Sequence, residues 1–197
     1  MTSKTDIYNM ALNELGISSP ITNATIKTDS KAIILNSFYD NARDEVLKAF
    51  DWNFAESFRE LTPSIEKCLD PRFLFMFDYP QDCLSAREIF EIDGDKQKKK
   101  FRLSSDSAGR KVILANQENI VLRYTRRITT ESMFDSEYCS ALALYLAGLA
   151  GKSLTGSEQK ADSALKKYWD RVRLSQISNA GEGQEVDEDN TTYLDAR

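Results

Sequence analysis

The feature that most restricts the fold is an apolar stretch of twelve residues, 140–151, with the sequence SALALYLAGLAG. It lies within residues 131–154, where large apolar side chains recur at the three- and four-residue spacing of a helix. These side chains belong to Phe134, Tyr138, Leu142, Tyr145 and Leu149. The stretch is apolar almost all round, so a helix formed there must be buried on more than one side. Its apolar run, residues 141–150, is about half as long as a membrane-spanning helix, which needs roughly 20 residues.

Three other segments have the periodicity of helices that could cover this central one. Residues 4–15 place apolar side chains at every fourth position and are followed by Gly16, a common helix stop. Residues 29–50 repeat apolar side chains every three or four positions behind good capping residues. Residues 158–179 carry a third stripe of this kind. The sequence therefore predicts a bundle of four helices.

Residues 86–128 form the clearly β-like region. Turn sequences separate four short candidate strands, at residues 86–92, 100–104, 110–115 and 119–128. The connections are too short for crossover helices, so the strands are predicted to form an antiparallel meander.

Residues 51–80, which precede the β-like region, are irregular, aromatic-rich and divided by two prolines. An alternating set of aromatic residues predicts one extended segment there. The set comprises Phe73, Phe75, Phe77 and Tyr79. Such a stripe usually packs in a core, and its alternative role is an exposed interface.

The predicted fold class is mainly α with a small antiparallel β meander, an α+β arrangement. A single domain is expected over residues 1–180, with helices in 1–55 and 130–180 and an irregular, β-rich insertion at 56–129. In residues 181–197, six acidic residues against one arginine account for the whole net charge of −5. This segment also has too little apolar content to fold alone, so an acidic, flexible tail is predicted.

The chain contains no histidine. Histidine is the commonest general base and metal ligand near neutral pH, so Ser-His-Asp and Cys-His catalysis and His-containing zinc sites are excluded. Cys68, Cys83 and Cys139 are far apart without CxxC spacing, which predicts reduced thiols. We expect no catalytic residue, no metal and no cofactor, and so no enzyme.

Two short motifs have both a chemical and a plain structural interpretation. Gly151-Lys152-Ser153 is similar to the end of a phosphate-binding loop, but position 146 is Leu and a helix leads into it. Its small residues are therefore expected to let helices pack closely. The lysine run at a predicted hairpin tip could contact a partner, and a solvated hairpin end explains it equally well. That run includes Lys96, Lys98, Lys99 and Lys100.

A series of short segments follows the order found in one known family. They are residues 6–16 (DIYNMALNELG), 20–21 (PI), 39–47 (YDNARDEVL), 51–55 (DWNFA), 79–84 (YPQDCL), 122–128 (LRYTRRI) and 193–197 (YLDAR). Together they resemble the head-to-tail adaptor proteins of short-tailed phages, also called tail tubular protein A, tail accessory factor or gatekeeper. The last segment has Tyr-Leu where a tryptophan is common in that family.

The resemblance implies a virion structural protein of the tail or neck, made in the host cytoplasm. Such adaptors assemble under the portal protein as a ring, typically of twelve copies, which extends the DNA channel and carries the tail nozzle. The family's C-terminal segment docks with the portal, which makes Tyr193, Leu194, Asp195, Ala196 and Arg197 candidate portal-binding residues. Lys96, Lys98, Lys99 and Lys100 are candidate contacts to the nozzle or another partner. A neutral body would let DNA pass without binding it, and no membrane contact is expected.

Two alternatives stay open at this point. A tail-associated peptidoglycan hydrolase would need two carboxylates roughly 5 to 9.5 Å apart, one with a raised pKa, and the sequence identifies no such pair. A neck or stopper protein of a long-tailed phage would share the helical fold but contact different neighbours.

Overall fold

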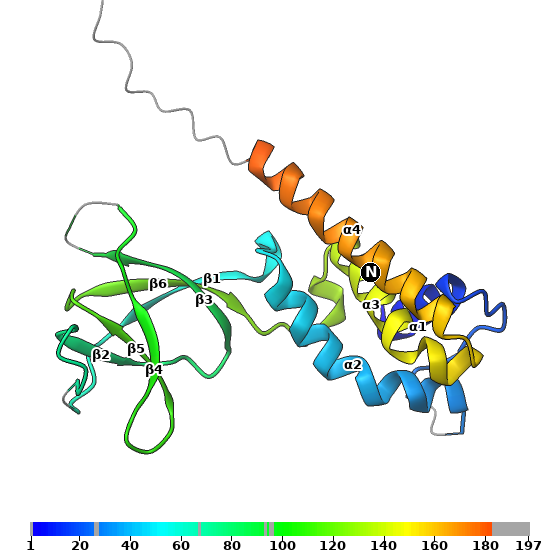
Figure 1. Cartoon of the computed structure of the whole chain (residues 1–197), viewed down its shortest axis with the longest axis horizontal. Coiled ribbons are helices and arrows are strands. Elements are labelled where there is room, and N and C mark those ends of the chain that lie inside the picture. Colours follow the sequence, from blue (N-terminus) through cyan, green and yellow to red (C-terminus); the bar gives the residue numbers. More distant parts are fainter. Residues whose placement is uncertain (1, 26–27, 67, 93, 95–96, 183–197) are drawn as a thin grey trace, which may run out of the picture.

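A computed structural model describes residues 2–25, 28–66, 68–92, 94 and 97–182 of the chain. Helices gather at one end of the molecule and strands at the other (Figure 1). This mixed α+β content agrees with the predicted class. None of the helices in the described part is long and apolar enough to cross a membrane.

The helical bundle is built around the apolar segment that the sequence placed at its centre. Its α-helices are α1 (Lys4–Glu14), α2 (Ser30–Ala49), α3 (Ser136–Thr155) and α4 (Glu158–Glu182). The other three all pack against α3. Ala141, Leu142 and Ala143 of α3 are each at most 1% exposed, and consecutive residues of a helix point about 100° apart around its axis. The prediction of a helix buried on more than one side is confirmed.

Close packing of α3 against α4 depends on two glycines. A Cβ atom at Gly151 would lie 2.9 Å from Cβ and 3.0 Å from Cα of Ala161, and one at Gly148 would overlap the Leu165 side chain. The helix continues to Thr155 and ends at Gly156, whose φ of 70° is left-handed. The small residues around Lys152 therefore serve helix packing, as expected.

Replacing Gly151 with Val should lower the free energy of unfolding by about 1–3 kcal/mol, since the new side chain would force the two helix backbones apart. Ser163→Val on the exposed face of α4 is the matched control, because it adds a β-branched residue without touching α3. Urea denaturation followed by circular dichroism measures both. Equal stabilities of the two variants would contradict the packing role.

The strands form two three-stranded antiparallel sheets, so the predicted single meander is wrong. The first sheet has the order β1 (Glu56–Leu61), β6 (Ile120–Arg126), β3 (Cys83–Glu91). The second has the order β2 (Phe75–Asp78), β5 (Lys111–Ala115), β4 (Arg102–Ser105). A meander would pair β3 with β4, but β3 pairs with β6. The inner faces of the two sheets then pack on one shared core. Strand β1 lies in the segment predicted to be irregular.

The core between the sheets contains the predicted aromatic stripe. Phe77 is completely buried beside Ile113 and Leu122, and the half-buried Phe75 and Tyr79 pack against the same cluster. Phe73 instead packs with Met76, Val112 and Leu114 on the outer face of the second sheet. The core interpretation of the stripe is therefore confirmed.

Candidate functional site

The five predicted portal-binding residues, Tyr193, Leu194, Asp195, Ala196 and Arg197, lie outside the described residues. The structure does describe the helix that leads to them. The C-terminal end of α4 projects past the other helices (Figure 1). The chain that follows Glu182 therefore starts from a projecting position.

The basic run is described except for Lys96, and it lies along β3. The backbone N–H of Lys99 donates to the carbonyl oxygen of Ile89 at 2.9 Å. Lys98 forms an ion pair with Glu88, and Nζ of Lys99 lies 3.5 Å from Oε2 of Glu91. Lys100 is exposed. Glutamates of β3 thus offset two of these charges, which weakens the attraction of the run for an acidic partner.

The segments that resemble the adaptor family meet where the helical bundle joins the strands. Arg127 Nε donates to Oδ2 of Asp44 at 2.9 Å, which ties the chain after β6 to α2. The N–H of Arg127 donates to the carbonyl oxygen of Asp82 at 2.8 Å. Arg123 Nη2 donates to Oδ2 of Asp51 at 2.6 Å. Four of the seven family-like segments contribute a residue to these three contacts, and we call this region the junction.

Arg123 is the central cation of the junction. Its Nε donates to Oε2 of Glu56 at 2.7 Å, and its Nη1 lies 3.6 Å from Oε2 of Glu88. Burial disfavours its charge, but hydrogen bonds to Glu56 and Asp51 raise the pKa of Arg123 above its ordinary value. One permanently charged guanidinium therefore holds together carboxylates from three places: the end of α2, β1 and β3.

Arg87 of β3 attaches the sheet to the C-terminal end of α2. Its Nη2 donates to the carbonyl oxygens of Lys48 and Phe50 at 3.1 and 2.9 Å. These carbonyls lie where a helix has no hydrogen-bond partners of its own. Its Nε donates to Oγ1 of the buried Thr125 at 2.8 Å. The guanidinium therefore links α2, β3 and β6.

Trp52 forms the apolar part of the junction. Its indole Nε1 donates to the carbonyl oxygen of Val46 at 2.8 Å. Its ring packs edge-on against Phe50 and Tyr138, with centroids 4.8 and 5.3 Å away. Trp52 therefore holds the end of α2 against α3.

The first two family-like segments are joined by a separate contact. The amide oxygen of Asn9 accepts from the N–H of Ile21 at 2.8 Å, and its Nδ2 donates to the carbonyl oxygen of Ile21 at 3.0 Å. Ile21 is buried in the bundle core. Asn9 therefore fixes the connection between α1 and α2, a role that spacing along the sequence does not indicate.

Two observations on the described residues bear on the hydrolase alternative. They include no group of three or more side chains suited to hold a metal ion. A general acid needs a carboxyl group with a raised pKa. Hydrogen bonds with Ser3 lower the pKa of Asp6, and those from Arg72 lower the pKa of Asp70.

Neither a scan against models of protein families nor a search of curated proteins finds a match to this chain. The junction geometry and the family-like segments are therefore the basis on which a function can be proposed.

Proposed function

We propose that this chain is the head-to-tail adaptor of a tailed phage. In this role it is a virion structural protein of the neck or tail that assembles as a ring under the portal, extends the DNA channel and carries the nozzle. The observation that carries the proposal is the convergence of family-like segments on the junction. Residues that are far apart in the sequence contact one another there. This is expected if members of the family share one arrangement of the bundle relative to the sheets.

The charge distribution supports a role as a conduit. Residues 1–180 have no net charge, because the tail carries all of the −5. Tight binding to DNA needs clustered cations that neutralise phosphates. In the described part, Arg123, Arg127 and Lys98 are each paired with a carboxylate. A wall of this kind would let DNA slide.

The two ends of the molecule suit two different neighbours in this proposal. The segment after Glu182 leaves from the projecting end of α4 and would dock with the portal. Its last residues, Tyr193 and Leu194, offer an aromatic and an aliphatic side chain for that contact. The sheets lie away from the bundle, and the turn with Lys98 and Lys100 would face the nozzle.

Deleting residues 183–197 should weaken binding to the portal protein encoded in the same genome at least about a hundredfold, or roughly 2.7 kcal/mol. The deletion removes none of the residues that form the described bundle and sheets, so the circular dichroism spectrum and melting temperature should stay unchanged. Sedimentation and negative-stain electron microscopy of the mixture measure binding and ring formation.

Two further variants separate the parts of the tail. Tyr193→Ala with Leu194→Ala should weaken docking almost as much as the deletion. Neutralising the acids at 185 and 187–189 to amides should have a smaller effect, if the terminal side chains make the contact. A full-length chain that never binds the portal would contradict the adaptor role, and unimpaired docking of the deletion variant would contradict the role of the tail. Release of soluble fragments from purified peptidoglycan would instead support the hydrolase alternative.

A further inference from the structure

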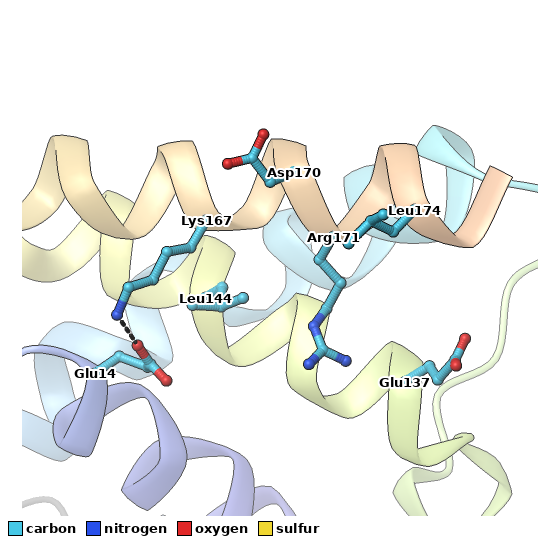
Figure 2. Close-up of a pocket in the computed structure, with 7 residues that line it drawn as sticks. All are labelled: Glu14, Glu137, Leu144, Lys167, Asp170, Arg171 and Leu174. Carbon is cyan, nitrogen blue, oxygen red and sulfur yellow. Dashed lines mark hydrogen bonds and ion pairs between the residues drawn. The ribbon is translucent and has the colours of Figure 1, made fainter. Parts of the chain in front are cut away.

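A pocket of about 550 Å³ opens between α1, α3 and α4 (Figure 2). Leu144 of α3, only 8% exposed, lines it together with Leu174 of α4, which is 64% exposed. The side chain of Arg171 extends from α4 toward α3 within the pocket (Figure 2). Its guanidinium has no ion pair or hydrogen bond with any residue of the described part. The pocket therefore combines two apolar side chains and an available planar cation in a lining whose other four residues are charged.

The opposite side of α4 carries an exposed tryptophan. Trp169 is 60% exposed, although its ring lies against that of Tyr168 with centroids 4.9 Å apart. Residues of an α-helix are about 100° apart around the axis, so Trp169 points about 160° away from Arg171 and about 140° away from Leu174. The exposed ring and the pocket thus lie on nearly opposite sides of one helix.

The two surfaces complement each other in shape and charge. A tryptophan side chain fits a pocket of this volume, where the leucines would cover its ring and the guanidinium of Arg171 could stack on its face. On the helix, Lys166 lies three residues before Trp169 and has no ion pair with another residue of the described part. The charged residues of the pocket lining are Glu14, Glu137, Asp170, Lys167 and Arg171. Glu14 is already paired with Lys167 and Asp170 with Arg173, so Glu137 is the acid of the lining without an ion pair to another described residue, and it could meet the Lys166 of a second copy.

We infer that Trp169 of one copy of this chain inserts into the pocket of a second copy, between Leu144, Leu174 and Arg171. The two surfaces are different patches of one molecule, so the contact is head-to-tail and can repeat from copy to copy. Such a contact closes into a ring when the rotation per step divides a full turn. This contact would join neighbouring copies in the ring of the proposed adaptor, so its role in the virion rests on the proposed function.

Mixing of two variants of the full chain tests this geometry. Trp169→Ala removes the inserted side chain but keeps the pocket, and Leu174→Glu places a charge in the pocket but keeps Trp169. Both positions are exposed, so neither change should disturb the fold. Ile33→Ala is the matched control, because Ile33 is an exposed apolar residue of α2 that belongs to neither surface.

Sedimentation velocity up to several hundred micromolar should show concentration-dependent association of the wild-type chain and of Ile33→Ala. Trp169→Ala and Leu174→Glu should each associate at least tenfold more weakly. Their equimolar mixture should form dimers but no larger species, since only one intact contact can form per pair.

Several outcomes would overturn the inference. These are a wild-type chain that stays monomeric throughout, a single variant that associates like the wild type, or a mixture that recovers no dimer although each variant has lost association. Portal-dependent rings formed normally by Trp169→Ala would also overturn this contact, while leaving the adaptor function in place. Failure of the wild-type chain to bind the portal would overturn the adaptor function but not a head-to-tail contact seen with the chain alone.

Discussion

Replacing Trp52 with Ala is expected to lower the free energy of unfolding by about 3–5 kcal/mol, the largest effect of any single substitution proposed for this chain. Trp52 is 3% exposed, so its removal leaves a cavity among Phe50, Phe54 and Tyr138. The carbonyl oxygen of Val46 also loses the indole N–H that it accepts from. Both losses affect the connection between α2 and β1.

Trp169→Ala provides the matched control for this prediction. It is the same chemical change at a residue that is 60% exposed, so it should alter the stability of the monomer by less than about 1 kcal/mol. Trp52→Phe should fall between the two, because it keeps most of the ring and loses the hydrogen bond. Urea denaturation at low protein concentration, followed by circular dichroism, compares all three. Equal losses at positions 52 and 169 would contradict the role of Trp52 in the junction.

The helices could be predicted because each carries its own periodic signal. For α2 the apolar stripe and the capping residues predicted residues 29–50, and the structure has Ser30–Ala49 with Asp29 as the N-cap. Asp29 accepts from the N–H of Lys31 at 2.9 Å, as a capping residue should. Local chemistry thus sets these boundaries, and local chemistry can be read from a single sequence.

Strand β1 and the sheet partners could not be predicted in this way. The sequence of β1, ESFREL, is mostly polar and does not alternate, because β1 is an edge strand with little of its surface in the core. The pairing of β3 with β6 places Cys83 opposite Arg126, although strands β4 and β5 of the second sheet lie between them in the sequence. Such partners are chosen by the shared core and not by neighbours in the sequence.

The junction was missed for the same reason, since its contacts join residues far apart in the chain. A signal was nevertheless present at Arg123, a charged residue in the middle of the strand IVLRYTR. A charge held in such a strand requires partners, because burying it unpaired is costly. The sequence could therefore have indicated that Arg123 is paired, but the identity of Asp51, Glu56 and Glu88 as its partners depends on the fold.

Replacing Arg123 with Met should lower the free energy of unfolding by about 2–3 kcal/mol, somewhat less than the loss of a fully buried ion-pair partner. The side chain of Arg123 is 21% exposed, so water compensates part of the lost interaction. The apolar stem of methionine keeps much of the packing. The main cost arises because Asp51, Glu56 and Glu88 would repel one another without the cation between them.

Two companion variants distinguish this network from an ordinary surface ion pair. Arg59→Met is the matched control, since Arg59 is 48% exposed and lies 3.4 Å from Asp82, and its loss should cost less than about 1 kcal/mol. Adding Asp51→Asn to Arg123→Met should restore part of the stability, because one of the repelling charges is removed. Without Arg123→Met, Asp51→Asn should instead destabilise the chain. A double variant whose loss equals the sum of the two single losses would show that these charges act independently, and that Arg123 does not hold the junction together.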